Sequence, residues 1–376
     1  MYFPTLLVFI FVRRGYEMEK KMKRYRLILW LILVCLFLSS CTLTAPITPS
    51  TEQDEPASSK KNSMQVHVID VGQGNSTLVK LPDGSTMLID AGERDYGETV
   101  TDYLRLQGIG KIDYLVGTHP HSDHIGGLRR VVQEMDIGKI YMPKKSSTTA
   151  TFKKLLEAIK AKGLSVESAK AGKEIVAGED FKVEILSPVQ EDYGDEMNLY
   201  SVVIRITYGA RRFLFMGDAE TENEQQIKDV SADFIHVGHH GSRTSSGEEF
   251  VRRVGAQIAV ISVGKDNSYG LPDEDVLARW TRVGAVIYRT DEAGSLVFEC
   301  DGEEIFQGDV TVSEQRVEVP QTSNWVLNTS SKKIHYPDCS AVAGMKQKNK
   351  GESNKTIAEL EAEGYTVCGT CDPVEG

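Results

Sequence analysis

Three imidazoles and one carboxylate lie within six positions of this 376-residue chain, at His119, His121, Asp123 and His124. In an extended segment the side chains at i and i+2 point the same way, so His119 and His121 can converge on one ion. Asp123 and His124 would then turn toward a second ion. Imidazole suits zinc, iron and manganese, and a carboxylate adds charge that favours a neighbouring ion. The spacing predicts a metal site, and the alternative is a set of surface or structural histidines.

The segments on either side of this run indicate how it is positioned. Residues 114–117 are apolar and predict a strand, Gly126 and Gly127 allow a sharp turn, and residues 128–135 predict a helix. We therefore expect the ligands on a loop between a strand and a helix, where α/β folds commonly place their chemistry. Further helices are predicted at 152–162 and 221–230, between short apolar strands. This alternation predicts an α/β protein.

Other motifs follow in order along the chain. Together with the H-x-H-x-D-H run they resemble the metallo-β-lactamase superfamily, and in particular the nuclease-like domain of competence proteins of the DNA-uptake type. The motifs lie at residues 66–76, 87–92, 213–218, 235–242 and 261–272. The resemblance implies a metallo-β-lactamase αββα sandwich over residues 64–310, with two β-sheets face to face and helices outside.

The same resemblance implies a role for individual residues. Asp90 would support the histidine run from behind, Asp218 would bridge two ions, and His239 or His240 would complete the second. Because two adjacent side chains of an extended chain point to different sides, we expect one of these histidines to face the substrate or a supporting partner. The implied metal ligands are His119, His121, Asp123, His124, Asp218, His239 and His240, with Asp123 and His240 also catalytic and Asp70, Asp90, Asn198 and Ser201 supporting.

Three departures from the family pattern concern this site. Asn75 stands where the group usually has Asp, and Leu271 stands where it usually has His. No histidine falls between His124 and Asp218, and Asn198 and Ser201 occupy that region. The first ion would then have a weaker ligand set, so one or two divalent metals, zinc or manganese with iron also compatible, are expected.

The N-terminus predicts where the protein acts. A basic stretch at 20–26 precedes twelve apolar residues at 27–38, too few for the roughly 20 that cross a bilayer, so residues 1–40 read as a signal peptide. Cys41 follows as in a bacterial lipobox, which predicts a lipid-anchored protein on the extracytoplasmic face of the membrane. An ordinary signal peptide with a chance cysteine is the alternative, and Met18 or Met22 would be a more usual start. Residues 41–63 are rich in Pro, Ser, Thr and Glu and predict a disordered tether.

The last segment, residues 323–376, has a metal-binding pattern of its own. His335, Cys339, Cys368 and Cys371 provide four ligands for one structural zinc, which can stabilise a fold of this size. The segment resembles the small zinc-binding module of the Ada repair protein, although Ada uses four cysteines. Disulfides that include Cys300 are the alternative, because an extracellular protein lives where thiols oxidise.

These features favour a metal-dependent hydrolase, a phosphodiesterase or nuclease that cleaves extracellular DNA with a metal-activated water. The formal net charge of −11 would repel a polyanion, but six lysines against two acidic residues over 323–355 give a local positive region. The alternatives are a phosphorylcholine-esterase-like hydrolase of cell-wall phosphodiesters and a non-catalytic surface binding module; β-lactam hydrolysis is less favoured.

Overall fold

The computed structural model describes residues 63–308, 325–335, 339–355 and 357–368. The predicted signal peptide with Cys41, nearly all of the predicted tether, and the zinc ligand Cys371 lie outside the described residues. None of the helices in the described ranges has the length and apolar character that a membrane span requires.

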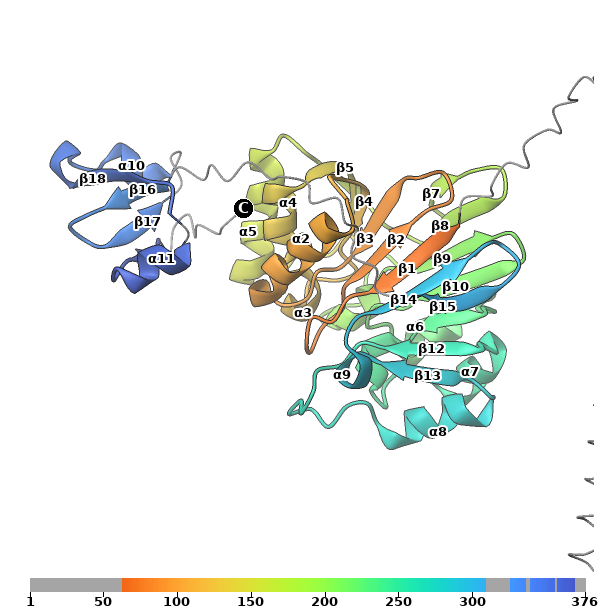
Figure 1. The fold of residues 1–376 in the computed structure, drawn as a ribbon. Helices are drawn as coiled ribbons and strands as arrows, with labels where there is room; N and C mark the ends of the chain where they lie inside the picture. The colour runs from red at the N-terminus through yellow and green to blue at the C-terminus, as the bar shows by residue number, and fades with distance from the viewer. Residues whose placement is uncertain (1–62, 309–324, 336–338, 356, 369–376) are drawn as a thin grey trace, which may run out of the picture. The chain divides into compact units, whose positions relative to one another are not determined.

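Two mixed β-sheets form the centre of the larger domain (Figure 1). In spatial order the first sheet contains β15 (Ile305–Gly308), β14 (Leu296–Cys300), β1 (Met64–Val68), β2 (Thr77–Lys80), β3 (Thr86–Ile89), β4 (Lys111–Val116), β5 (Asp136–Met142) and β6 (Val166–Ser168). The second contains β13 (Val286–Arg289), β12 (Ile258–Ile261), β11 (Phe234–His236), β10 (Arg211–Phe215), β9 (Val203–Tyr208), β8 (Phe181–Ser187) and β7 (Glu174–Ala177).

Helices cover the outer face of each sheet (Figure 1). The first sheet packs against α2 (Gly97–Leu106), α4 (Leu128–Glu134) and α5 (Ala150–Ala161). The second packs against α6 (Thr221–Gln226), α7 (Glu248–Val254) and α8 (Glu274–Arg282). The shorter helical turns are η1 (Arg94–Tyr96), α3 (Ser122–Ile125), η2 (Met197–Tyr200), η3 (Gly238–Gly241) and α9 (Thr290–Ala293). The four-layer αββα order confirms the predicted fold class.

An apolar core fills the space between the sheets. Met64, Val66 and Val68 alternate along β1 and are fully buried in this core, as expected for one face of a strand. The ring of Phe234 on β11 lies 5.1 Å from that of Phe298 on β14, centroid to centroid, and so joins the two sheets. The rigid sandwich fixes the strand ends from which the functional loops begin.

Most of the predicted elements occur near their expected bounds. The predicted strand at 114–117 is the end of β4, and the helices predicted at 128–135 and 152–162 are α4 and α5. The helix predicted at 221–230 is shorter, because α6 ends at Gln226 and Ile227 is extended. Ile227 and Val230 are instead buried under the second sheet, and Arg253 donates hydrogen bonds to the carbonyls of Ile227 and Lys228.

Parallel pairing brings several loops to one edge of the sandwich. β3, β4 and β5 are parallel neighbours in the first sheet, and β10, β11, β12 and β13 are parallel neighbours in the second. The carboxyl ends of parallel strands meet at the same edge. The residues that follow β3, β4, β10, β11 and β12 therefore gather there.

The C-terminal segment folds as a small unit around its own four-stranded sheet, ordered β18-β16-β17-β19. Trp325, Ile334, Leu360 and Tyr365 form its core, and Trp325 Nε1 donates a hydrogen bond to the Lys355 carbonyl. Its elements are β16 (Trp325–Asn328), β17 (Lys333–His335), α10 (Ser340–Ala343), η4 (Gln347–Asn349), β18 (Lys350–Ser353), α11 (Ile357–Ala362) and β19 (Thr366–Val367).

Candidate metal centre

The histidine run occupies the loop between β4 and α4, as predicted. His119 and His121 precede α3, whereas Asp123 and His124 belong to that short helix. The helix turns tightly into α4 because Gly126 packs directly on the main chain of another loop, where an added Cβ would lie 2.3 Å from Arg94 N. Glycine is therefore required at this close approach.

Two groups of potential ligands converge at this loop. The first group contains His119, His121 and Asp218. His119 Nε2 lies 3.0 Å from His121 Nδ1 and 3.8 Å from Asp218 Oδ2. Two ligand atoms held about 2.0–2.1 Å from one tetrahedral ion are about 3.3 Å apart, so this spacing fits a divalent metal.

The second group contains Asp123, His124, Asp218 and His240. Asp218 Oδ1 lies 3.1 Å from His124 Nε2 and 3.6 Å from His240 Nε2. Asp123 Oδ2 lies 3.2 Å from His240 Nε2 and 3.8 Å from His124 Nε2. One oxygen of Asp218 therefore faces each group, which is the arrangement expected of a bridging carboxylate.

Hydrogen bonds behind the ligands fix which ring nitrogen faces the centre. His124 Nδ1 lies 2.7 Å from the fully buried Asp90 Oδ2, to which it donates. His240 Nδ1 donates to the Ser262 carbonyl at 2.9 Å. In both residues Nε2 is left as the lone-pair nitrogen that a metal binds. The supporting role predicted for Asp90 matches this geometry.

Unsatisfied buried atoms mark the same place. His124 Nε2 and Asp218 Oδ1 are buried without a hydrogen-bond partner. Leaving a buried polar atom unsatisfied costs about 1–3 kcal/mol, so such atoms commonly belong to a ligand site. The donor types, their spacing and these two atoms together fit a divalent metal in the second group.

His239 takes a different position from His240. The segment is not extended as expected, since both residues have left-handed backbone angles with φ of 50° and 52°. His239 lies outside both ligand groups, with Nδ1 2.9 Å from Thr244 Oγ1 and 3.3 Å from Glu220 Oε1. Its side chain is 25% exposed, so it lies at the rim.

The other predicted supporting residues divide between the centre and its surroundings. Ser201 Oγ accepts a hydrogen bond from the Asp218 amide at 3.1 Å, which helps to position Asp218. Asn198 donates to Glu220 Oε1 at 3.0 Å, and its own Oδ1 is buried without a hydrogen bond. Asp70 does not reach the ligands; its Oδ1 accepts from the Gly72 amide at 3.0 Å in a neighbouring loop.

Burial and opposite charges act against each other in the centre. Burial alone would lower the pKa of His124, but Asp218, Asp90 and Asp123 raise it well above its usual value. Burial would raise the pKa of Asp218, but His124 and His240 hold it well below the usual range. Burial, and then repulsion by His124, lowers the pKa of His119. Asp218 is therefore ionised and available as a ligand.

Three residues of the site were not identified from the sequence. Thr118 donates through its amide and hydroxyl to both oxygens of Asp90, at 2.8 and 2.7 Å. Glu220 holds His239, and its position two residues after Asp218 is the only signal that pointed to it. His236 lies under the centre, with Nε2 2.9 Å from Ser262 Oγ, and burial lowers its pKa to about 3.

The C-terminal unit contains a third group of potential ligands. His335, Cys339 and Cys368 are buried, and their ligand atoms lie within 4.8 Å of one another. Cys339 and Cys368 are free thiols in the structure. Zinc bonds of about 2.3 Å to sulfur and 2.0–2.1 Å to nitrogen are compatible with this separation.

Comparison with known proteins gives consistent results. A sequence profile described as "Metallo-beta-lactamase superfamily" matches residues 69–265. ComE operon protein 3 of Bacillus subtilis is 32% identical over 255 residues, covering 62% of this chain and 33% of that protein. Competence protein ComA of Neisseria gonorrhoeae is 30% identical over 249 residues, covering 65% and 33%.

This chain thus spans about a third of the length of those curated relatives. Among solved structures, the metallo-beta-lactamase fold protein YhfI from Bacillus subtilis aligns with a TM-score of 0.44 and 16% identity. That alignment covers 64% of this chain and all of YhfI.

Proposed function

Because the chain belongs to the metallo-β-lactamase superfamily, we propose that it is a metal-dependent hydrolase that cleaves phosphodiester bonds in extracellular nucleic acid, in the first instance DNA. The observation that carries the proposal is the pair of ligand groups that share Asp218. Two neighbouring cation sites suit a phosphodiester, whose attacking and leaving oxygens can each be stabilised by one ion.

In this proposal His119, His121 and Asp218 hold one ion, and Asp123, His124, Asp218 and His240 hold the other. When bound, such ions polarise the phosphoryl group and lower the pKa of water. Asp123, whose side chain is 27% exposed, is placed to accept the proton of the attacking water. Asp90 and the Ser262 carbonyl keep His124 and His240 in the required tautomers.

His239 is placed to assist the leaving group. Burial would lower its pKa, but the contact with Glu220 raises it above the usual value and so stabilises the imidazolium. A protonated imidazole at the rim can donate its proton to the departing sugar oxygen. Glu220 and Thr244 would orient the ring during this step.

The choice of DNA is supported by the names of the relatives. One is named Competence protein ComA and another ComE operon protein 3, and each match covers more than 60% of this chain. Asn75 and Leu271 depart from the pattern of that group, and neither belongs to a ligand group of the described residues.

The test uses the full chain in detergent, loaded separately with zinc and manganese. We expect metal-dependent cleavage of end-labelled single-stranded DNA, and loss of at least a hundredfold in rate for Asp218→Asn, because both groups lose their shared ligand. Metal content measured on the same samples should fall in parallel. Hydrolysis of bis(p-nitrophenyl) phosphate without DNA cleavage would favour a cell-wall phosphodiesterase, and no hydrolysis of either would favour a binding module.

We also propose a lipid anchor at Cys41 that holds the enzyme on the extracytoplasmic face of the membrane. The basic and apolar segments that precede Cys41 support it. Cys41→Ser is expected to abolish incorporation of labelled palmitate in a bacterial host and to release the protein from the membrane fraction. Retention of both label and membrane association in the variant would contradict the anchor.

A structural zinc in the C-terminal unit is the remaining part of the proposal. His335, Cys339 and Cys368 supply three buried ligands, and Cys371, which lies outside the described residues, would supply the fourth. A closed four-ligand site is typical of structural zinc.

A further inference from the structure

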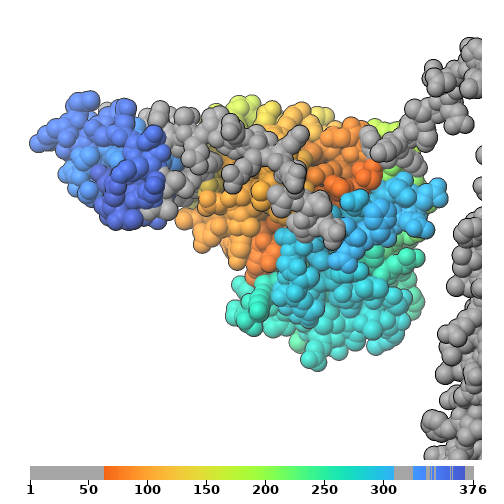
Figure 2. All heavy atoms as spheres, viewed as in Figure 1, coloured from red at the N-terminus to blue at the C-terminus, as the bar shows by residue number. Residues whose placement is uncertain are grey.

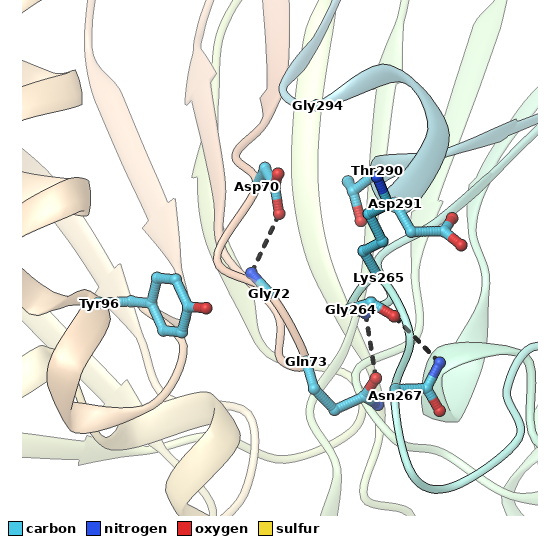
Figure 3. Close-up of a pocket in the computed structure, with 10 residues that line it drawn as sticks. All are labelled: Asp70, Gly72, Gln73, Tyr96, Gly264, Lys265, Asn267, Thr290, Asp291 and Gly294. Carbon is cyan, nitrogen blue, oxygen red and sulfur yellow. Dashed lines mark hydrogen bonds between the residues drawn. The ribbon is translucent and has the colours of Figure 1, made fainter.

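A pocket of about 410 Å³ lies in the larger domain (Figure 3). Its walls come from the loop after β1, from Tyr96 at the end of η1, and from the segments around Gly264 and Asp291. This volume lies within the roughly 300–1,000 Å³ that small-molecule sites occupy. The pocket contains none of the proposed metal ligands, so it is a separate feature.

Two loops connect the pocket to segments of the candidate metal centre. On one side the Asn75 amide donates to the Asp123 carbonyl at 3.1 Å, and an added Cβ on Gly74 would lie 2.5 Å from that same oxygen. On the other side the Gly264 amide donates to Gln73 Oε1 at 3.1 Å (Figure 3). Gly264 is two residues from Ser262, whose carbonyl holds His240. The loops that line the pocket therefore contact, or continue from, segments that hold the candidate metal ligands.

Several polar groups in the pocket are available to a ligand. Lys265 and the amide nitrogen of Gln73 make no hydrogen bond or ion pair within the described ranges. Asp70 uses one oxygen for the Gly72 amide and leaves the other open. Asp291 is instead paired with Arg289 through two hydrogen bonds. The open groups thus include one cation, one carboxylate oxygen, one amide donor and the Tyr96 hydroxyl.

This combination is complementary to a nucleotide. The amide donor and carboxylate acceptor match the mixed donor and acceptor edge of a base, and the lysine matches a phosphate. The open groups therefore suit a nucleotide unit of a nucleic acid.

An exposed aromatic ring stands on the loop that forms one wall. Tyr269 is 73% exposed, the highest value among the large hydrophobic side chains of the described residues. Asn267 holds this loop, because its side chain donates to the Gly264 and Leu271 carbonyls and accepts from the Tyr269 and Leu271 amides. An exposed ring on a fixed loop is suited to stack on a base, which typically strengthens binding by roughly five- to a hundredfold.

We propose that this pocket is a nucleoside subsite. It binds the nucleotide of a single-stranded substrate that adjoins the scissile phosphate. Gln73 and Asp70 bind the base edge, Lys265 binds the neighbouring phosphate, and Tyr269 stacks on a base at the rim. The inference rests on the proposed nuclease function and specifies how its substrate is held. It predicts that the enzyme prefers single-stranded over duplex DNA, because a base must leave its partner to enter.

The test compares two substrates for three variants of the full chain. Lys265→Gln removes the cation, Tyr269→Ala removes the ring, and Gln73→Glu removes the donor but keeps Oε1 for the Gly264 amide. Each is expected to lower kcat/KM on a single-stranded oligonucleotide by five- to fiftyfold, mainly through KM. The factor by which each variant lowers kcat/KM on bis(p-nitrophenyl) phosphate should be at least five times smaller than the factor on the oligonucleotide. Matched controls are Lys160→Gln on α5 and Phe306→Ala on β15, which should leave both substrates unchanged.

An abasic oligonucleotide sharpens the result. With the base beside the cleaved bond removed, Gln73→Glu should cause less than a twofold further loss. Equal losses on both substrates, or unchanged DNA cleavage in all three variants, would overturn the subsite and leave the nuclease function standing. If the unaltered protein hydrolyses the small diester but not DNA, the nuclease function and the subsite both fail.

Discussion

At the scale of single residues, the candidate metal ligands could be picked out because metal binding requires particular side chains at close spacing. His119, His121, Asp123 and His124 are recognisable from composition alone. Their partners Thr118 and Glu220 could not be assigned, because a hydroxyl or a carboxylate acquires its role only from the neighbours that folding provides. The different roles of His239 and His240 likewise depend on two left-handed backbone positions that the sequence pattern does not encode.

His239 offers a test at this scale. If it donates a proton to the leaving oxygen, His239→Ala should slow hydrolysis of a diester with an alkoxide leaving group by about 10²–10⁴-fold. Hydrolysis of bis(p-nitrophenyl) phosphate should fall much less, because nitrophenolate departs without a proton. Rates of the variant on both substrates, with metal content measured in parallel, provide the check. Equal losses accompanied by loss of metal would instead make His239 a ligand.

At the scale of elements, sequence periodicity located the helices but not every end. α6 stops four residues before the predicted end because Ile227 and Val230 turn inward and Arg253 binds the freed carbonyls. These are contacts with α7, more than twenty residues away, and no local pattern reports them. The same pair of helices is joined by Glu224 on α6, which accepts hydrogen bonds from the Ser246 and Gly247 amides just before α7.

Glu224 predicts a dependence of stability on pH. Burial raises its pKa from 4.5 to about 7, although the two amides act in the opposite direction. The folded state therefore holds a proton that the unfolded state releases, so this contribution is present below pH 4.5 and lost as the pH rises through 7. At about 1.4 kcal/mol for each pKa unit, the loss is at most about 3 kcal/mol.

Glu224→Gln, which resembles the protonated acid, should remove that dependence. Urea unfolding at pH 5 and pH 8 would measure the free energy of unfolding of both proteins. The free energy of unfolding of the variant, minus that of the unaltered protein, is expected to increase from pH 5 to pH 8. If the two proteins differ in unfolding free energy by the same amount at pH 5 and pH 8, the pKa of Glu224 is not raised in the folded state.

The contact between the two sheets predicts a second effect on stability. Phe234 is fully buried between Phe213, Phe215 and Phe298, so Phe234→Ala leaves a cavity. The free energy of unfolding should fall by about 3–5 kcal/mol. Phe306→Ala, at a ring that is 45% exposed on β15, is the matched control and should cost far less. If chemical denaturation shows similar decreases in the free energy of unfolding for Phe234→Ala and Phe306→Ala, the assigned core is wrong.

At the scale of the whole molecule, the motifs predicted a catalytic domain and a C-terminal unit, and the structure describes a sandwich and a separate small sheet. The order of strands could not be derived from local patterns, since β1 pairs with β14 more than two hundred residues later. The αββα arrangement was accessible only through the resemblance to a family. The predicted segments before residue 63 stay predictions.

The zinc site proposed for the C-terminal unit leads to a prediction for the full chain. Cys368→Ser should lower zinc content by one ion per molecule and make the C-terminal unit sensitive to proteolysis, because a structural zinc contributes directly to folding. Hydrolysis of bis(p-nitrophenyl) phosphate should persist, since no proposed catalytic ligand lies in that unit. Zinc analysis and limited proteolysis provide the measurements. Unchanged zinc content, together with a disulfide found by mass spectrometry, would support oxidised thiols instead.

The pairing of β1 with β14 has a consequence for how such a domain can be combined with others. Met64 lies opposite Cys300, so the first and last long strands of the first sheet are immediate neighbours. Figure 2 shows early-chain atoms in orange beside late-chain atoms in light blue on that face. The chain then runs through β15 to Gly308, opposite Val297, so the domain begins and finishes on closely spaced strands of one sheet and could be inserted into a loop of another protein. The same pairing of β1 with β14 makes the sandwich a suitable candidate for circular permutation, with new ends in the exposed turn at Gly84.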